Sequence, residues 1–331
     1  MDAETIWKMS DKELLDYIER ELMPNRSKEI RFYAPSFMYY KTGHFCSSAT
    51  SFPSISVTGA FCGLKCKHCG GKVLNTMLPA LTPKRLVEVC NEVEAKGGLG
   101  CLISGGCLAD GSVPLERFLG AIAEVKRTLD LTLVVHTGLI DLHFARKLRD
   151  AGIDAALIDI IGSDETIREI YQLEVSVNDY DKSLHALHES GIPFVPHVLV
   201  GLHYGRLNGE LEALKMIRKY SPSAVIVIAL MPIHGTAMET TTPPTPIDVA
   251  KVLVGARFML PKTPIVLGCM RQKGEYKAEI DVLAVKAGVT AIAFPAEQAI
   301  KLAESMQVKT SLSPVCCSQI FSDLKRNIWQ I

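Results

Sequence analysis

The sequence predicts an α/β fold: a parallel (βα)8 TIM-type barrel with an N-terminal extension and a C-terminal tail over the barrel mouth. Eight short apolar runs rich in β-branched residues alternate with helical patterns, an order typical of strands that pair in parallel. These runs are apolar along their whole length, which indicates strands buried on both faces. The chain has 331 residues and is 48% apolar, so it is long enough to bury a core of this size.

The expected elements follow one another from residue 54 to residue 307. The strands are Ser54–Gly59, Gly100–Ser104, Leu131–His136, Ala155–Ile161, Pro193–Val200, Ala224–Leu230, Thr263–Gly268 and Val289–Phe294. The helices are expected over 82–97, 114–129, 138–151, 163–172, 179–190, 207–220, 246–260, 275–287 and 295–307.

Capping residues and glycines set several of these boundaries. Thr82 stands before Pro83, a typical N-cap followed by a proline in the first turn, and Pro246 opens another helix. Gly152 and Gly191 each end a helix directly before a strand. From these boundaries we expect an N-terminal extension over 1–50, the barrel over 51–307 and a C-terminal tail over 308–331.

Composition and charge narrow the class of protein. Equal numbers of basic and acidic residues give a formal net charge of zero, which argues against nucleic acid or an anionic membrane as a partner. The start of the chain does not have the basic and then apolar pattern of a signal peptide. No apolar run reaches the ~18 residues that a membrane span needs. We therefore expect a cytoplasmic protein whose ten cysteines are metal ligands or buried thiols, not disulfides.

Cys62, Cys66 and Cys69 form a C-x3-C-x2-C motif directly after the first expected strand. Functional residues of a parallel barrel gather at this end of the strands. Thiolates bind iron–sulfur clusters, zinc or Cu(I). A cubane cluster takes four thiolates, so three cysteines leave one metal position open. A zinc site is the alternative, but structural zinc sites close with four ligands, usually in paired motifs, and no paired motif accompanies these cysteines.

The motif resembles the radical S-adenosylmethionine (SAM) superfamily, with Phe61 before the first cysteine and His68 where that family usually has an aromatic residue. The resemblance implies a [4Fe–4S] cluster held by Cys62, Cys66 and Cys69, whose open iron binds the amine and carboxylate of SAM. It also implies that one electron cleaves SAM into methionine and a 5′-deoxyadenosyl radical, which abstracts hydrogen from the substrate.

The same resemblance places SAM-binding residues at the ends of other strands. Ser104, Gly105 and Gly106 match a Gly-Gly motif that binds the SAM amine, and two glycines let a ligand approach the backbone closely. Asp159 matches a position that binds the SAM ribose in biotin synthases. The other expected SAM-binding positions are His136, Gly201, Pro232 and Gly235. At the glycines and the proline the alternative is an ordinary turn, and at His136 it is a purely structural role.

Several remaining cysteines predict an auxiliary iron–sulfur cluster. Three separate segments bring thiols towards the barrel mouth, and free thiols in such segments are prone to oxidation. The alternative is a set of scattered cysteines with no shared metal. Arg271 falls near an arginine that ligates an auxiliary cluster in biotin synthases. The expected ligands are Cys46, Cys269, Cys316 and Cys317.

The likeness to biotin synthases and to archaeal-type two-protein lipoyl synthases implies a radical SAM enzyme that inserts sulfur into an unactivated C–H bond. The expected substrate is an octanoyl chain on a lipoyl-carrier protein or peptide. The expected partners are a companion radical SAM protein and an electron donor such as ferredoxin or flavodoxin. A metallocofactor maturase or methyl-inserting radical SAM enzyme is the first alternative, and a non-catalytic iron–sulfur protein is the second.

Overall fold

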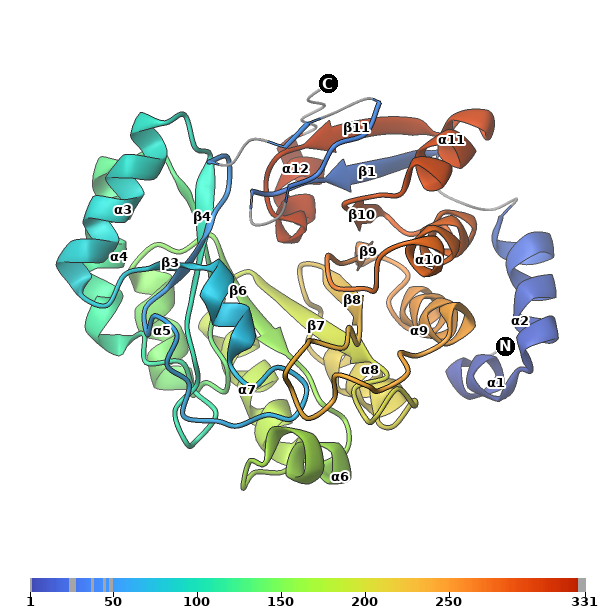
Figure 1. Cartoon of the computed structure of the whole chain (residues 1–331), viewed down its shortest axis with the longest axis horizontal. Helices are drawn as coiled ribbons and strands as arrows, with labels where there is room; N and C mark the ends of the chain where they lie inside the picture. Colours follow the sequence, from blue (N-terminus) through green and yellow to red (C-terminus); the bar gives the residue numbers. More distant parts are fainter. Residues whose placement is uncertain (1, 24–27, 37–38, 44–45, 48–49, 327–331) are drawn as a thin grey trace.

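The computed structural model describes residues 2–23, 28–36, 39–43, 46–47 and 50–326. At its centre is a parallel sheet whose described strands follow the order β11-β1-β10-β9-β8-β7-β6-β5-β4-β2-β3. The sheet curls into an open half-barrel with helices on its outer face (Figure 1). The α/β class and the parallel TIM-like sheet predicted from the sequence are confirmed.

All eight expected strands are present, and they are neighbours in the predicted order. Each pairs in parallel with the next, as in Val135 opposite Ala156 and Asp159 opposite His197. Their bounds are β2 (Ser54–Ser56), β4 (Gly100–Ser104), β5 (Thr132–His136), β6 (Ala155–Asp159), β7 (Phe194–Val200), β8 (Val225–Ala229), β9 (Ile265–Leu267) and β10 (Ala291–Ala293).

Three further strands change how the barrel ends. β1 (Glu29–Tyr33) pairs in parallel with β10 on one side and with β11 (Lys309–Ser313) on the other. The short β3 (Leu78–Pro79) pairs with β2. Because β1 occupies the free edge of β10, β10 does not close onto β2, and the expected closed eight-stranded barrel is an open one. A cavity of about 210 Å³, lined by residues of β1, β11, β5 and the C-terminal tail, lies at this opening.

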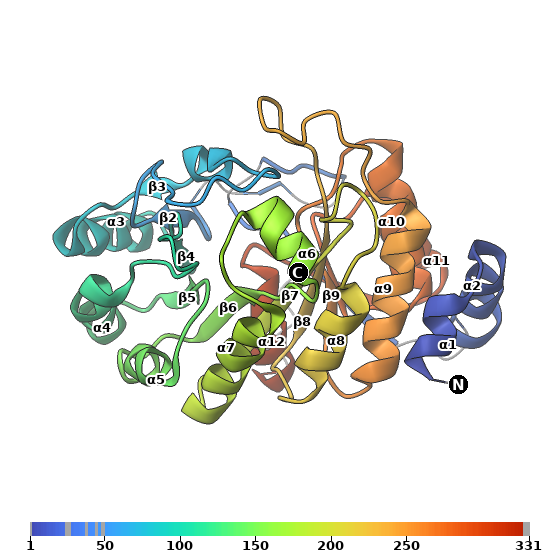
Figure 2. The same cartoon turned by 90° about the horizontal axis from the view of Figure 1, so that it is seen from below.

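The helices lie mainly on the outside of the curled sheet (Figure 2). The expected Thr82 cap is present and accepts from Arg85 N–H. Pro246 begins a helix as expected, and Thr245 before it forms a capping box with Asp248. The outer helices are α3 (Pro83–Ala95), α4 (Leu119–Thr128), α5 (Leu142–Asp150), α7 (Val177–Ser190), α8 (Glu210–Arg218), α9 (Pro246–Met259), α10 (Glu275–Lys286) and α11 (Glu297–Ser305).

The remaining helices are short. α6 (Asp164–Thr166) continues into a π-helical turn, Ile167–Tyr171, after β6. At the N-terminus, α1 (Ala3–Lys8) packs against α9, and α2 (Asp11–Tyr17) follows it. In the described part of the chain, none of the helices combines the length and the apolar composition that crossing a membrane requires.

The C-terminal tail enters the half-barrel. After β11, a 3-10 turn (Cys317–Gln319) leads into α12 (Ile320–Arg326), which lies within the curl of the sheet (Figures 1 and 2). Cys317 and Ile320 are buried, and the Tyr33 hydroxyl on β1 donates to Asp323 Oδ2 at 2.7 Å. The tail therefore fills the interior of the half-barrel as well as reaching its mouth.

Candidate functional site

The loop that carries the three-cysteine motif is anchored to two neighbouring loops. Gly63 N–H donates to the Cys107 carbonyl at 2.7 Å, and Lys67 N–H donates to the Ile170 carbonyl at 2.8 Å. The first bond ties the motif to the loop after β4, and the second ties it to the π-helical turn after β6. The motif is thus fixed at the carboxyl end of the strands.

Gly106 explains how closely this loop can approach β4. A β-carbon on Gly106 would overlap the Phe61 carbonyl oxygen and stand 2.5 Å from the Cys62 Cα. No flexible side chain could move aside, because both contacts are backbone atoms. Gly106 N–H donates to Thr58 Oγ1 at 2.7 Å, which also ties the turn to the segment after β2. The glycine predicted to admit SAM therefore has a second role in seating the cysteine loop.

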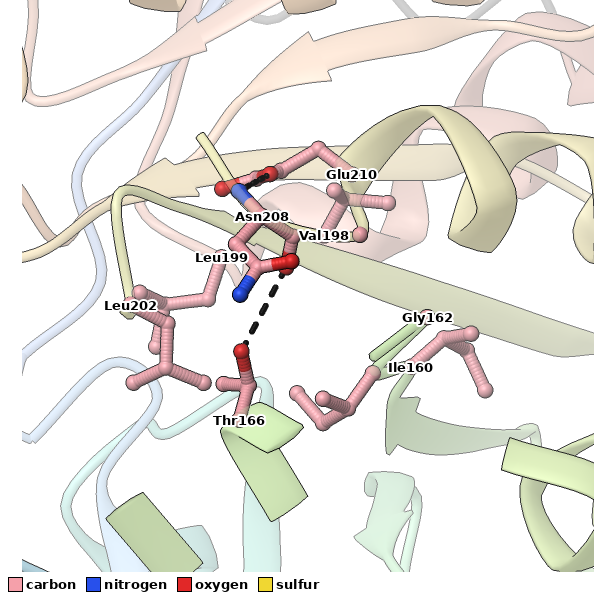
Figure 3. Close-up of a pocket in the computed structure, with 10 residues that line it drawn as sticks. Ile160, Gly162, Thr166, Val198, Leu199, Leu202, Asn208 and Glu210 are labelled. Atoms are coloured by element: carbon pink, nitrogen blue, oxygen red, sulfur yellow. Dashed lines mark hydrogen bonds between the residues drawn. The ribbon is translucent and has the colours of Figure 1, made fainter. Parts of the chain in front are cut away.

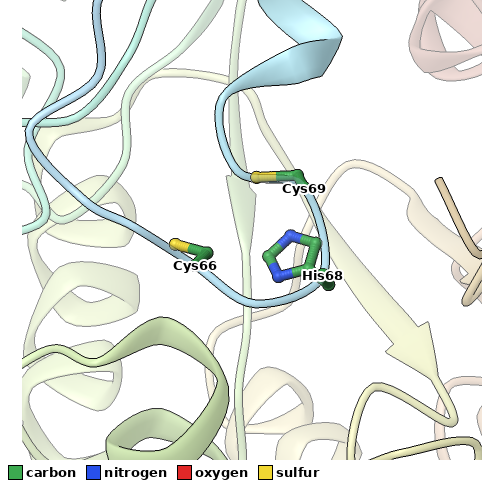
Figure 4. Close-up of side chains that lie close together, drawn as sticks. All are labelled: Cys66, His68 and Cys69. Atoms are coloured by element: carbon green, nitrogen blue, oxygen red, sulfur yellow. The ribbon is translucent and has the colours of Figure 1, made fainter. Parts of the chain in front are cut away.

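The ligand atoms of Cys66, His68 and Cys69 lie within 4.8 Å of one another. Figure 4 shows the three side chains on the inner side of the loop. Cys62 lies nearby, with its Sγ 3.9 Å from the Cys107 carbonyl oxygen. The His68 ring packs on Tyr171 with a centroid separation of 5.2 Å, and its buried Nδ1 has no hydrogen-bond partner among the described residues.

The thiols of this loop influence each other's ionisation. A hydrogen bond from the Cys66 thiol, with help from His68, lowers the pKa of Cys69 against the effect of burial. The same hydrogen bond and burial raise the pKa of Cys66. Three soft donors on one loop suit an iron–sulfur cluster, and the orphaned His68 nitrogen marks a place where a polar partner fits.

Cys107 stands beside these thiols. Burial raises the pKa of Cys107 to about 12, and the charges of Cys62, Asp159 and Cys69 add to the shift. In the sequence, its position directly after Gly106 at the end of β4 indicates that it belongs to the site.

The loop after β8 meets the cysteine loop from the other side. A β-carbon on Gly235 would touch the Lys72 side chain, and one on Gly70 would lie 3.9 Å from Thr236 Cγ2. Gly235 has φ 72° and donates its N–H to Glu239 Oε2 at 2.6 Å. The segment that contains Pro232 and Gly235 thus lies next to the cysteine loop.

Gly201 directly follows β7 in a left-handed conformation, with φ 72°, which favours glycine. Its N–H donates to the buried Glu210 Oε1 at 2.8 Å, and Asn208 N–H donates to Oε2. Burial raises the pKa of Glu210 to about 7, although these hydrogen bonds oppose the shift. The loop after β7 is therefore held by a buried carboxyl group.

A group of polar side chains lines the interior between β5, β6 and β7. His136 ends β5, Asp159 ends β6, and His197 lies opposite Asp159 in β7. Their ligand atoms lie within 4.8 Å of one another, and Ser104 Oγ reaches the His136 carbonyl at 3.5 Å. The sequence singled out His136 and Asp159 but gave His197 no role, although it is a polar residue in an otherwise apolar strand.

Ionisation in this group follows from its contacts. Burial alone would raise the pKa of Asp159, but His136 and, more weakly, His197 and His68 lower it to about 2. Burial alone would lower the pKa of His136, but Asp159 and, more weakly, Cys316 raise it. Burial lowers the pKa of His197 to about 4. Asp159 is thus held as a carboxylate beside two histidines, and its charge favours the protonated form of the nearer one, His136.

A second group of thiols lies on the other side of the sheet opening. Cys269 follows β9, and Cys316 and Cys317 follow β11. Cys316 affects the pKa of both Cys269 and His136, so these side chains share one region. A hydrogen bond from the Cys317 thiol, with others from Ser318, lowers the pKa of Cys316, whereas burial raises the pKa of Cys269 to about 12.

Cys46 and Arg271 differ from the other candidate ligands. Cys46 is exposed, and its described contacts are with Tyr39 and Ser47. The Arg271 guanidinium is buried. It pairs with the Asp281 carboxylate at 2.6 Å and donates to the carbonyls of Gly268 and Ala293. Arg271 therefore fixes the loop after β9, and most of its N–H donors bond to the protein there.

The cavity in Figure 3 is a small gap behind the strand ends. It has a volume of about 10 Å³, about the room of one water molecule. Thr166 Oγ1 donates to the Asn208 carbonyl at 3.4 Å across it. It is too small for SAM, and none of the expected site residues lines it.

An open parallel half-barrel with three cysteines on the loop after its first barrel strand defines a radical SAM type of protein. Residues 56–217 match the family model described as the radical SAM superfamily. These residues form a radical SAM domain, a kind of domain that implies a [4Fe–4S] cluster and SAM as cofactors.

Curated relatives include biotin synthases. The one from Clostridium acetobutylicum is 25% identical over 219 residues, which cover 65% of this chain and 64% of that protein. The one from Pelobacter propionicus is 24% identical over 229 residues, which cover 66% of this chain and 68% of that protein. The chain thus matches about two thirds of the length of these relatives.

Solved structures show the same fold at low identity. Methylornithine synthase superposes with a TM-score of 0.63 at 16% identity, covering 98% of this chain and 95% of that chain. The [FeFe]-hydrogenase maturase HydG from Carboxydothermus hydrogenoformans gives a TM-score of 0.63 at 15% identity, covering 97% and 77%. At these identities the likeness concerns the fold alone.

Proposed function

We propose that this chain is a radical SAM enzyme that inserts sulfur into an unactivated C–H bond. One observation carries the proposal: two groups of thiols face the same interior from different parts of the sheet. The motif cysteines lie beside β2 and β4, and Cys269 and Cys316 lie at the ends of β9 and β11. Asp159, near His68, and His136, near Cys316, lie between the two groups.

The motif cysteines would hold the SAM-binding cluster. Cys62, Cys66 and Cys69 offer three thiolates from one anchored loop, which leaves one iron for SAM. When bound, the cluster and SAM supply one-electron chemistry that removes a hydrogen atom from an unactivated carbon. The chain contributes the fixed position of the loop, through Gly106 and the bonds of Gly63 and Lys67.

The expected SAM contacts remain proposals with structural support. Ser104, Gly105 and Gly106 end β4 beside the motif, and the loop with Pro232 and Gly235 meets it. Gly201 ends β7, and His136 and Asp159 line the interior below. Together they surround the face of the loop on which SAM would lie.

Sulfur would come from an auxiliary iron–sulfur cluster on Cys269, Cys316 and Cys317. The lowered pKa of Cys316 favours the thiolate form that ligates metal. In the reaction each C–S bond replaces one C–H bond, so the two sites must share one substrate cavity. Cys46 is the remaining expected ligand, and its exposed position makes it the one to test separately.

We propose an octanoyl chain on a lipoyl-carrier protein or peptide as the substrate. The similarity to biotin synthases supports sulfur insertion as the reaction class. A companion radical SAM protein would make one of the two C–S bonds, and ferredoxin or flavodoxin would supply the electron.

Isotope transfer tests this proposal. The protein is reconstituted anaerobically with iron and with sulfide enriched in a heavy sulfur isotope, then incubated with SAM, dithionite and an octanoyl-lysine peptide. We expect labelled sulfur in the peptide product. The molar amount of labelled product should not exceed the molar amount of auxiliary cluster. The Cys269→Ser variant should form no labelled peptide product but should still cleave SAM. A product that gains a methyl group or is rearranged, without sulfur, would favour the alternative radical SAM reactions instead.

A further inference from the structure

The segment around the cysteine loop differs in charge from the chain as a whole. The formal net charge of the chain is zero, yet residues 30–87 contain no Asp and no Glu. The basic residues of this segment are Arg31, Lys41, Lys65, Lys67, Lys72, Lys84 and Arg85. A positive region in an otherwise neutral protein attracts a partner of opposite charge.

Three cations of this region are exposed at or beside the cysteine loop. Lys65 lies within the motif and Lys72 directly after it, and neither forms an ion pair with another described residue. Arg117 belongs to a different segment, but its guanidinium donates to the Leu81 carbonyl at 3.2 Å. The basic surface therefore extends from the cysteine loop to the start of α4.

The same part of the surface exposes large apolar side chains. Phe61 is 67% exposed, Leu81 is 54% exposed and Leu108 is 42% exposed. Phe61 directly precedes the first motif cysteine, and a β-carbon on Gly63 would stand 3.4 Å from the Leu108 carbonyl carbon. A β-carbon on Gly59 would stand 3.2 Å from Leu81 Cδ2. Aromatic and apolar side chains together with charged ones are typical of a protein–protein interface.

Acidic residues of two neighbouring loops are engaged within those loops. Asp110, after β4, accepts from the N–H and the hydroxyl of Ser112. Glu239, after β8, pairs with His234 at 3.1 Å. The two lysines of the cysteine loop have no such partners in the described part of the chain, so their charge remains available to another molecule.

We propose that this face of the cysteine loop binds an acidic electron carrier of the flavodoxin type. We call it the docking face, and its residues are Phe61, Leu81, Leu108, Lys65, Lys72 and Arg117. The inference rests on the proposed function in that the motif cysteines must hold a cluster. The carrier would give up one electron from its fully reduced flavin, and the oxidised cluster would take it up.

The position of the docking face favours an electron carrier over other acidic partners. Cys62 and Cys69 are half-buried, and Gly63 and Gly70 next to them are exposed. A cluster on this loop would therefore lie just beneath the docking face. Electron transfer needs a short distance but no large interface, and complexes of redox proteins bury less than about 1,200 Å².

A comparison of two reductants tests the docking face. The reconstituted full chain is incubated with SAM and either dithionite, which is too small to need a docking face, or a reduced acidic flavodoxin. The readout is the rate of 5′-deoxyadenosine formation with flavodoxin divided by the rate with dithionite. The double variant Lys65→Glu with Lys72→Glu should lower this ratio by about tenfold or more at low ionic strength. Added salt should lower the ratio of the wild type as well.

Two further variants complete the comparison. Lys262→Glu is the matched control, because Lys262 is exposed just before β9, at the amino end of the strands, and it should leave the ratio unchanged. Arg117→Glu lies outside the cysteine loop and should lower the ratio. It keeps the test valid if the double variant fails to bind its cluster, which iron analysis reports.

An equal ratio in the wild type and Arg117→Glu, or in the wild type and a cluster-containing double variant, would overturn the inference. So would an unchanged ratio together with weaker binding of an octanoylated carrier protein, because the face would then serve the substrate's carrier. A wild type that forms no 5′-deoxyadenosine with dithionite would remove the proposed function. Calorimetric titration with flavodoxin would then decide the inference, since the double variant should bind more weakly than the wild type and equal binding would overturn it.

Discussion

Gly106 and Cys62 are in such close contact that a β-carbon on Gly106 would stand 2.5 Å from the Cys62 Cα. This contact couples the end of β4 to the first cysteine of the motif. The glycine is therefore needed for the position of the cluster loop, whatever it also does for SAM.

The first prediction follows from this contact. Gly106→Ala should push the motif loop away from β4, lower the bound iron of the reconstituted protein to less than half, and destabilise the fold by about 1–3 kcal/mol through overpacking. Gly120→Ala is the matched control, because a β-carbon there meets nothing within 4 Å. It should keep full iron content. Equal iron in both variants would show that the contact does not position the loop.

The second prediction concerns the auxiliary cluster. Cys269→Ser, Cys316→Ser and Cys317→Ser should each lower the iron content by about one cluster while SAM cleavage continues. Cys46→Ser separates the exposed cysteine from this group, and a loss of iron there would add it to the ligands. Iron and sulfide analysis with Mössbauer spectroscopy measures the number of clusters directly. Unchanged iron in all four variants would remove the auxiliary cluster from the account.

The third prediction is a pH dependence of stability. The folded-state pKa of Glu210 is about 7, above its ordinary value of 4.5, so the folded state binds more protons between these values. Stability should therefore fall as pH rises from about 4.5 to about 7, by about 3 kcal/mol, and then level off.

Urea midpoints of the wild type and of Glu210→Gln, measured between pH 5 and pH 8, test this dependence. The variant should show a flatter profile, because its side chain does not ionise. Glu212→Gln changes an exposed residue of the same helix and should follow the wild type. Parallel profiles for the wild type and Glu210→Gln would contradict the assignment.

The fourth prediction compares a buried and an exposed arginine–aspartate pair. Asp281→Ala leaves the fully buried Arg271 without its partner and should lower the free energy of unfolding by about 3–5 kcal/mol. Asp150→Ala removes a surface pair with Arg149 and should lower the free energy of unfolding by less than about 1 kcal/mol. Chemical denaturation measures both. Similar costs would show that Arg271 does not depend on Asp281 to fix the loop after β9.

The sequence predicted most of the sheet because its strands are apolar enough to be buried on both faces. β4 has the predicted bounds, Gly100–Ser104. β1 and β11 were missed because they contain Glu29, Arg31 and Lys309 and lack an apolar run. They form strands because β10 offers a free edge and they pair with each other, which no local pattern reports.

The candidate site was predictable where its residues are close in sequence. Cys62, Cys66 and Cys69 form one motif, and the structure brings the last two within 4.8 Å, together with His68. The position of His197 beside Asp159 depends on the register between β6 and β7. The seating of Cys62 on Gly106 likewise depends on a packing distance that the sequence alone does not contain.

The central claim is that Cys62, Cys66 and Cys69 hold a cluster that cleaves SAM. The most direct test is the formation of 5′-deoxyadenosine by the anaerobically reconstituted protein with SAM and dithionite, measured by mass spectrometry. The account predicts the product with the wild type and its absence with Cys62→Ala, Cys66→Ala or Cys69→Ala. A wild type that carries the cluster but forms no 5′-deoxyadenosine, or a cysteine variant that still forms it, would contradict the claim.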